Sequence, residues 1–420
     1  MYDYIKNQPI INIGCLGSVS DGKSTLIKVL TGIKTQKHSN ELIKNITIKQ
    51  GYANMKIWET NNNDSLSIQE NTSKENISNY ITTSSNNNLN NKLVNHISFV
   101  DCPGHQDLIL TMLSSINLMD GAIIVIAVDQ PISKKSQLYQ HLVAAKIGKI
   151  TKIIICLNKI DLVEKYTLLT RKKELDILLE KLNIKPFIII PTSFNKKLGI
   201  NYLVNSIMKL FNPEYYLNNI NNIEEPFFRI SRTFDINKPG ADFNNITGGV
   251  IGGSLMSGNL NINDEIEIRP GIININNNKI EWQPIKTKIL SIKTDEEKLD
   301  KVVPGGLIGL LTDIDPFYCK NDNLSGNIVG LIDKIPNVYI ELTLKINIIN
   351  MFDYIWKPNI NDIITLQIGI TSCTGKINKI TDNIFNIELF KPVCIKNNQH
   401  IIICFNINNI LCIVGDSYLL

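Results

Sequence analysis

Four short apolar runs in the first half of the chain are the feature that most restricts its fold. They are HISFVDCPG, GAIIVIAVD, KIIICLNKID and PFIIIPTS, and each ends at a polar turn. Segments with helical spacing, such as LILTMLSSINLM and QLYQHLVAAKIG, lie between them. Because continuous apolar strands that alternate with helices are buried on both faces, the pattern predicts a parallel sheet covered by helices. Right-handed crossovers in such a sheet bring the strand-end loops to one edge.

The pattern changes near residue 223. Short alternating strands with glycine turns follow, among them GGVIGGSLMSGNL and DEIEIRPG, and a second β region with YIELTLKINII and HIIICFNI begins near residue 336. Such alternation is typical of all-β barrels. We therefore predict an α/β domain with a parallel-dominated sheet over residues 1–222, followed by two all-β barrel domains over 223–335 and 336–420.

Residues 60–92 differ in composition from the rest of the first domain. The stretch is rich in Asn and Ser and has almost no large apolar side chains. It cannot bury enough apolar surface to offset the entropy lost on ordering. We interpret it as a flexible, low-complexity surface insertion, with a functional arm as the alternative.

Composition excludes several other classes of protein. The formal charge of +4 is too small to imply nucleic-acid binding on its own. No apolar stretch approaches the roughly 18 residues that span a bilayer, and the start of the chain does not have the pattern of a cleaved secretory signal. The eight cysteines form no C-x-x-C pair, and several lie in apolar runs, which favours a reducing compartment.

A glycine-rich loop follows the first apolar strand. GSVSDGKS, at residues 17–24, matches G-x-x-x-x-G-K-[ST] and precedes a helical pattern. Such a loop turns its backbone N–H groups toward phosphates, and the helix adds its positive end. Lys23 would act on the β- and γ-phosphates and the Ser24 hydroxyl on Mg²⁺. We predict a GTP- and GDP-binding loop formed by Ser20, Asp21, Gly22, Lys23, Ser24 and Thr25, against the alternative of a chance glycine turn.

A second motif, DCPGH, ends the next strand of the predicted sheet. An acidic residue there, Asp101, can hold Mg²⁺, usually through water. Gly104 allows the backbone to approach a γ-phosphate closely. A helix cap is the alternative role for Asp101.

The two following strands end in residues that suit a guanine base. In NKID, the Asp161 carboxylate can accept two parallel N–H bonds that adenine does not offer. The NKID residues Asn158 and Lys159 complete this motif, and the stem of Lys159 can cover the base. The loop of Ser193, Phe194 and Asn195 can present a backbone N–H to the guanine O6, although Ser193 could also cap a helix. Together with the phosphate loop, these motifs predict a P-loop GTPase domain.

Several segments resemble the gamma subunit of eukaryotic and archaeal translation initiation factor 2. They are HSNELIKNITIKQGYANMKIWE, HISFVDCPGHQDLILTML, FDINKPG and PGGLIGLLTDIDP, and the resemblance spans nearly the whole chain. It implies a GTPase that works with alpha and beta subunits and a guanine nucleotide exchange factor. Such a subunit binds methionyl initiator tRNA in its GTP state, delivers it to the small ribosomal subunit, and hydrolyses GTP on start-codon selection.

The resemblance also implies roles for single residues. His105 corresponds to the residue that positions the attacking water, so it is the predicted catalytic residue; an ordinary surface histidine is the alternative. Thr47 in NITIK matches the switch threonine that contacts Mg²⁺. Asn45 and Tyr52 match positions near the tRNA acceptor pocket, although Tyr52 could equally be a packed core aromatic.

The chain departs from the family pattern at several places. Ser18 and Asp21 replace two histidines of the phosphate loop, and the negative charge of Asp21 should weaken phosphate binding unless it faces away or binds a cation. Phe194 replaces a small residue, and we expect its side chain to point outward. A zinc knuckle would lie between Glu59 and Asn95, where there is no cysteine, so we expect no zinc.

Two other functions stay open at this point. One is an elongation factor Tu-like or selenocysteine-specific elongation GTPase, and the other is a nucleotide-locked scaffold without turnover. The segments NELIKNITIKQGYAN and FDINKPG favour the initiation subunit, and His105 argues against the scaffold. We expect no membrane partner and a cytoplasmic location, or the ribosome-containing compartment of a reduced nucleus-bearing endosymbiont, because the bias toward Lys, Asn and Ile resembles AT-rich coding.

Overall fold

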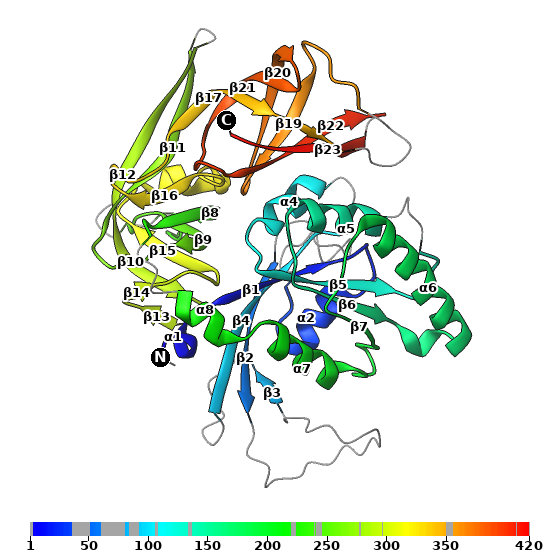
Figure 1. The fold of residues 1–420 in the computed structure, drawn as a ribbon. Helices are drawn as coiled ribbons and strands as arrows, with labels where there is room; N and C mark the ends of the chain where they lie inside the picture. Colours follow the sequence, from blue (N-terminus) through cyan, green and yellow to red (C-terminus); the bar gives the residue numbers. More distant parts are fainter. Residues whose placement is uncertain are drawn as a thin grey trace. The chain divides into compact units, whose positions relative to one another are not determined.

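The computed structural model describes residues 3–35, 51–59, 80–83, 92–105, 108–132, 137–219, 224–238, 240, 246–276, 279–295, 297–349, 356–408 and 410–419. These residues belong to two compact units. The first contains residues 1–105 and 119–218, and the second contains residues 106–118 and 219–420. Figure 1 shows the elements of both. Asn45, Thr47 and most of the stretch 60–92 lie outside the described residues.

The first unit contains a seven-stranded sheet with the order β3-β2-β4-β1-β5-β6-β7. The five strands from β4 to β7 in this order are parallel, and β2 runs antiparallel to both of its neighbours. The predicted parallel-dominated sheet is therefore confirmed. The strands are β1 (Ile11–Leu16), β2 (Gly51–Glu59), β3 (Tyr80–Thr83), β4 (Lys92–Asp101), β5 (Gly121–Ala127), β6 (Ile153–Asn158) and β7 (Ile188–Pro191).

Helices cover this sheet because its central strands are apolar on both faces (Figure 1). Helix α2 contacts β2, β3 and β4, α7 contacts β3 and β7, and α5 packs against α6. The helices are α1 (Asp3–Asn7), α2 (Lys23–Thr31), α5 (Gln137–Ile147), η2 (Ile160–Leu162), α6 (Lys165–Leu182), α7 (Ile200–Leu210) and α8 (Pro213–Asn219).

One strand lies inside the stretch that we interpreted as a flexible insertion. Tyr80–Thr83 forms β3 and pairs antiparallel with β2, from Lys56 to Glu59. The interpretation was therefore wrong for these residues. The physical reason is local, because YITT combines an aromatic residue with β-branched residues, which suit a pleated strand.

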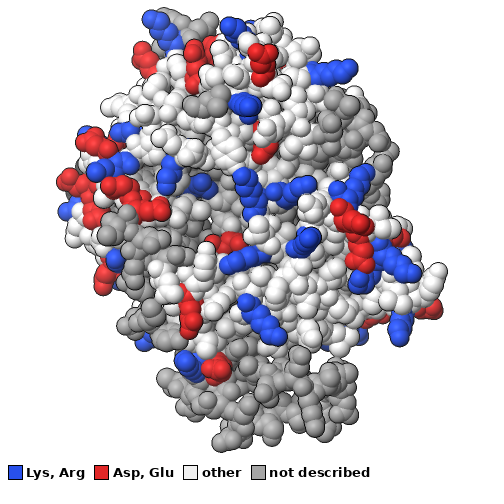
Figure 2. Space-filling view, viewed as in Figure 1, with Lys and Arg blue, Asp and Glu red and all other residues white. Residues whose placement is uncertain are grey.

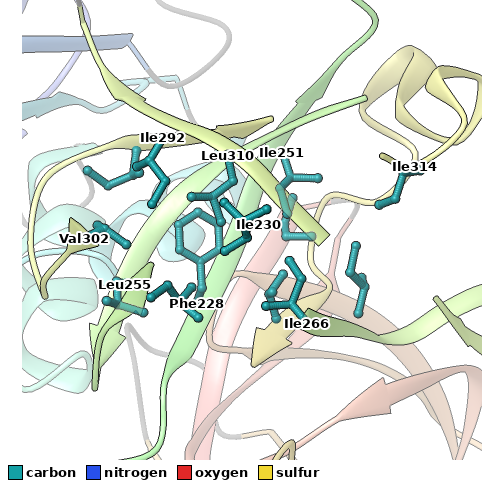
Figure 3. Packing of buried hydrophobic residues seen from close by; sticks show 14 of the residues in the cluster. Phe228, Ile230, Ile251, Leu255, Ile266, Ile292, Val302, Leu310 and Ile314 are labelled. Atoms are coloured by element: carbon teal, nitrogen blue, oxygen red, sulfur yellow. The ribbon is translucent and has the colours of Figure 1, made fainter. Parts of the chain in front are cut away.

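The second unit contains two antiparallel sheets. In the first, the order is β11-β16-β8-β9-β15-β12-β13, and an additional pairing of β11 with β12 closes the sheet into a barrel. Figure 3 shows its apolar interior around Phe228, Ile251 and Leu310. Its elements are β8 (Phe227–Phe234), β9 (Val250–Ser257), β11 (Glu265–Asn276), β12 (Lys279–Thr294), β13 (Glu297–Leu299), β15 (Ile308–Thr312), β16 (Ile328–Leu331), the small pair β10 (Leu260–Asn261) and β14 (Lys301–Val302), and η4 (Pro316–Asp322).

The second antiparallel sheet has the order β17-β21-β20-β19-β22-β23-β18. A bridge between Leu344 and Leu419 joins β17 to the end of the chain after β23. The core includes Trp356 stacked on Phe385. The strands are β17 (Val338–Lys345), β18 (Asn347–Ile348), β19 (Ile363–Ile368), β20 (Thr371–Thr381), β21 (Ile384–Cys394), β22 (His400–Ile407) and β23 (Ile410–Tyr418). The predicted fold class is confirmed, while the boundaries at residues 222 and 335 stay predictions.

Helix α4 (Ile109–Ile116) groups with the second unit, although it lies between β4 and β5 in the sequence. The Ser114 hydroxyl donates to the carbonyl of Ile370 at 3.2 Å and accepts from Gln367 Nε2 at 3.0 Å. The Arg229 guanidinium donates to the carbonyl of Asn117 at 2.6 Å. Polar contacts thus tie α4 to strands of both antiparallel sheets.

Among the described residues, no helix is both long enough and apolar enough to cross a membrane. Acidic and basic side chains are interspersed over the described part of the face in Figure 2. This distribution agrees with the small net charge of +4.

Candidate nucleotide-binding site

The loop between β1 and α2 depends on two glycines. Gly17 has φ +139° and Gly22 has φ +108°, a region that side chains rarely adopt. A Cβ atom at Gly17 would lie 2.2 Å from the carbonyl oxygen of Val125, and one at Gly22 would lie 2.4 Å from Asn158 Nδ2. The loop can therefore curl against β5 and β6 only with glycine at both positions.

Ser18 connects the two ends of this loop. Its carbonyl accepts from Lys23 Nζ at 2.7 Å, and its N–H donates to Asp21 Oδ2 at 2.7 Å. Lys23 is 6% exposed, and burial lowers the pKa of its ammonium, while the carboxylates of Asp101 and Asp21 oppose that change. The Lys23 ammonium is thus held inside the loop by the Ser18 carbonyl and by the charges of two carboxylates.

Asp101 lies at the end of β4, next to the end of β1 in the sheet. It is fully buried, and its Oδ2 accepts from Ser24 Oγ at 2.7 Å and from Thr35 Oγ1 at 2.5 Å. Carboxylate and hydroxyl oxygens are the ligands that Mg²⁺ prefers, so Ser24 and Asp101 suit this metal. Thr35 was not predicted, because no motif in the sequence marks it.

Gly104 brings the DCPGH backbone against the phosphate loop. A Cβ atom there would lie 2.6 Å from Lys23 Nζ and 2.9 Å from the carbonyl oxygen of Gly17. His105 follows as an exposed residue. His141 on α5 was not predicted from the sequence. It is buried and forms a hydrogen bond with the backbone of Gly104. Burial and the charge of Lys23 lower the pKa of His141 to about 3, so its imidazole is neutral.

Asn158, at the end of β6, joins the phosphate loop to the loop after β7. Its Nδ2 donates to the carbonyl of Asp21 at 2.8 Å, and its Oδ1 accepts from the N–H of Phe194 at 3.2 Å. The side chain is 4% exposed. Three strand-end loops are thus held by one amide, as the convergence of parallel strand ends leads us to expect.

Phe194 contradicts the expectation that its side chain points outward. It is 2% exposed, and its ring lies 3.4 Å from the position that a Cβ of Gly22 would occupy. The physical reason is that burial of a phenyl ring is favourable. The ring therefore packs beside Gly22 of the phosphate loop.

A pocket of about 240 Å³ lies beside these loops. Lys159 on its wall has φ +66° and pairs its Nζ with Asp129 Oδ2 at 2.9 Å, while Asp161 is exposed on η2. Leu162 was not predicted, and the signal for it was an apolar residue directly after NKID. The pocket is lined by Ser20, Gly22, Thr25, Asn158, Lys159, Asp161, Leu162, Ser193, Phe194 and Asn195.

Of the remaining predicted residues, the structure describes Tyr52 only. Tyr52 lies in β2 opposite Val100 and is half-buried. Asn45 and Thr47 lie outside the described residues, as does most of the interval in which we expected no zinc knuckle. Within the described residues, no group of three or more His, Cys, Asp or Glu side chains could hold a metal ion.

Comparisons with known proteins agree with this geometry. The family "Elongation factor Tu GTP binding domain" matches residues 8–213, and "Initiation factor eIF2 gamma, C terminal" matches residues 338–418. A bacterial selenocysteine-specific elongation factor superposes with a TM-score of 0.72 at 21% identity, over 98% of this chain and 58% of that one. The elongation factor SelB of Methanococcus maripaludis, in complex with a GTP analogue, gives 0.70 at 20% identity, over 98% and 79% of the two chains. The matched GTP-binding domain and the fold thus define a translational GTPase.

Relatives in sequence narrow this class. Subunit 3 of eukaryotic translation initiation factor 2 from Drosophila melanogaster is 34% identical over 98% of this chain and 89% of its own length. The gamma subunits of Encephalitozoon cuniculi and Methanocaldococcus jannaschii are also 34% identical, over 99% and 92% of this chain and 93% and 92% of their own lengths. The chain belongs to the gamma-subunit family of translation initiation factor 2, and the resemblance seen in its sequence is confirmed. It is a GTP-binding translation initiation factor.

Proposed function

We propose that this protein binds methionyl initiator tRNA in its GTP state, delivers it to the small ribosomal subunit, and hydrolyses GTP on start-codon selection. Its partners in this role are alpha and beta subunits, with which it forms a heterotrimer, and a guanine nucleotide exchange factor. It acts without a membrane partner, in the cytoplasm or in the ribosome-containing compartment of a reduced nucleus-bearing endosymbiont. One observation carries the proposal: a single buried amide, Asn158, joins the phosphate loop to the loops that carry Asp161 and Ser193.

Guanine selection is assigned to Asp161. Its carboxylate accepts from two neighbouring N–H groups of guanine, and the stem of Lys159 covers the base. The pairing of Lys159 with Asp129 keeps that stem on the pocket wall. The loop of Ser193, Phe194 and Asn195 offers a backbone N–H to the guanine O6.

The phosphate half is assigned to residues 20–25 together with Gly104. Lys23 and the loop N–H groups bind the phosphates. Mg²⁺ would be held by Ser24, Asp101 and Thr47, and when bound it neutralises charge on the phosphate oxygens. The buried carboxylate–hydroxyl pair of Asp101 and Ser24 supports this assignment.

Hydrolysis is assigned to His105, which orients the attacking water. Its place directly after Gly104, whose backbone lies against Lys23, supports this role. Phosphoryl transfer depends mainly on such positioning and on charge neutralisation. Asn45 and Tyr52 are assigned to the tRNA acceptor pocket.

Nucleotide selection tests the first half of the proposal. Calorimetry should show preference for GTP and GDP over ATP. The substitution Asp161→Asn presents an NH₂ donor in place of an acceptor, so it should exchange guanine for xanthine nucleotides, whose C2 carbonyl accepts. Equal affinity of the unchanged protein for GTP and ATP would refute the assignment.

Delivery and turnover need separate tests. In filter binding, the heterotrimer should retain initiator tRNA with GTP and lose much of that affinity with GDP, and it should bind elongator tRNA weakly. Single-turnover hydrolysis with small ribosomal subunits should fall at least about 100-fold in His105→Ala, as expected for loss of a positioned group. An unchanged rate in that variant would favour a nucleotide-locked scaffold.

A further inference from the structure

The side chain of Asp21 is the charged group of the phosphate loop that no role above explains. Its carboxylate is directed into the backbone of the site, where Oδ2 accepts from the N–H of Ser18 at 2.7 Å and Oδ1 accepts from the N–H of Ala127 at 3.2 Å. Ala127 ends β5, more than 100 positions along the chain. The side chain therefore braces the loop against the central sheet.

The main chain of Asp21 forms two hydrogen bonds of its own. Its carbonyl accepts from Asn158 Nδ2 at 2.8 Å, and its N–H reaches the carbonyl of Ser18 at 3.4 Å. One residue thus contacts the phosphate loop, the end of β5 and the NKID motif. Both oxygens of the carboxylate accept from backbone N–H groups, and the charges of Lys23 and Lys159 also act on it.

One feature of this arrangement acts against phosphate binding. The carboxylate adds a negative charge to a loop whose helix end and Lys23 attract negative groups. The effect depends on the charge at position 21, because a neutral Asn side chain there can keep the hydrogen bond from the Ser18 N–H but adds no charge.

We propose that Asp21 is a positioning residue that fixes the conformation of the phosphate loop before nucleotide binds. Through its negative charge, it also lowers the affinity for nucleotide phosphates and speeds the dissociation of nucleotide. The proposal rests on the guanine-nucleotide function assigned above and adds a determinant of affinity to it. Lys23 on α2 and Lys159 after β6 are the cations near this carboxylate, and Lys159 is shared with Asp129. Burial raises the pKa of Asp21, and the Ala127 N–H and Lys23 oppose this change. The direction indicates that keeping the buried carboxylate charged costs free energy.

The test compares nucleotides that differ only in their number of phosphates. Dissociation constants for GTP, GDP and guanosine would be measured for the unchanged protein, Asp21→Asn and Asp21→His, the residue of the family pattern. We expect both variants to bind GTP about tenfold more tightly, a change equivalent to about one pKa unit of charge interaction. The gain should be smaller for GDP and absent for guanosine, and it should come from slower dissociation.

A control substitution with the same change of charge is available on α6. Asp176 pairs with Lys172 at 2.7 Å on an exposed face, so Asp176→Asn should leave all three constants unchanged. A merely structural role of Asp21 would change the affinity for guanosine as much as that for GTP. Thermal unfolding would be recorded for each variant, and Asp21→His provides the comparison if Asp21→Asn does not fold.

Two results separate this inference from the proposed function. If the protein prefers GTP over ATP but neither variant tightens GTP binding, or if the gain is equal for guanosine, the inference about Asp21 is overturned and the function stands. If GTP and ATP bind equally, the function fails, while tighter binding of both triphosphates in the variants would still support the role of Asp21.

Discussion

The two hydrogen bonds of Asn158 allow a quantitative prediction. In Asn158→Ala, the carbonyl of Asp21 loses its bond at 2.8 Å and the N–H of Phe194 loses its bond at 3.2 Å. The amide is 4% exposed, so water does not readily replace it. A buried polar group left without its partner costs about 1–3 kcal/mol. We therefore expect the free energy of unfolding of the first unit to fall by about 3 kcal/mol in total.

The same substitution should affect function through geometry. Without the amide, the phosphate loop and the Phe194 loop are no longer held to one another, and affinity for GDP should fall at least about tenfold, which corresponds to 1.4 kcal/mol. Urea unfolding followed by circular dichroism gives the stability. Calorimetric titration with GDP gives the affinity.

Asn95 provides a matched control in the same sheet. It is fully buried in β4, its Nδ2 donates to the carbonyl of Phe211 at 3.1 Å, and its Oδ1 accepts from the N–H of His96 at 2.9 Å. It lies six residues before Asp101, or roughly 20 Å away along the strand. Asn95→Ala should lose similar stability and keep its affinity for GDP. A loss below about 1 kcal/mol in Asn158→Ala, or equal GDP affinities in both variants, would refute the reasoning.

Three further predictions follow from single contacts. Burial lowers the pKa of His96 and of His141 to about 3, so unfolding takes up protons below pH 6.5. The free energy of unfolding should therefore fall by about 2 kcal/mol per histidine from pH 6.5 to pH 5. Urea unfolding of His96→Gln or His141→Gln, compared with the unchanged protein at both pH values, measures this difference. Gly22→Ala should abolish tight GDP binding in calorimetry, because the new Cβ would lie 2.4 Å from Asn158 Nδ2 in a strained backbone region. Ser24→Ala should remove the difference in GTP affinity between Mg²⁺ and EDTA, because it deletes the hydroxyl beside Asp101.

The sequence was most informative where physical chemistry is local. Continuous apolar strands can be buried only between two layers of helices, so the parallel sheet and the convergence of its end loops followed directly. The motif at residues 17–24 predicted a curled glycine loop, and Gly17 and Gly22 have positive φ values in the structure. The strand at Tyr80–Thr83 was missed because the Asn- and Ser-rich residues around it dominated the composition of the stretch.

Side-chain partners that come from distant parts of the chain were not predictable. Thr35 binds Asp101 and His141 binds the Gly104 backbone, and neither residue belongs to a motif that records its partner. The direction of Asp21 depends on the N–H of Ala127, which no local pattern connects to it. From its charge alone, the Asp21 carboxylate could weaken phosphate binding, face away or bind a cation, and only the packing of β5 beside the loop shows that it accepts from backbone N–H groups.

The two departures nearest the pocket, at positions 21 and 194, share one structural explanation. Asn158 holds both loops, and at each it bonds a backbone atom: the carbonyl of Asp21 and the N–H of Phe194. A change of side chain at either position therefore leaves the bonds of Asn158 in place. The phenyl ring of Phe194 is buried beside Gly22, and the carboxylate of Asp21 accepts from two N–H groups. The connection between the two loops thus depends on Asn158, while the side chain at position 21 adds a separate brace between the phosphate loop and β5.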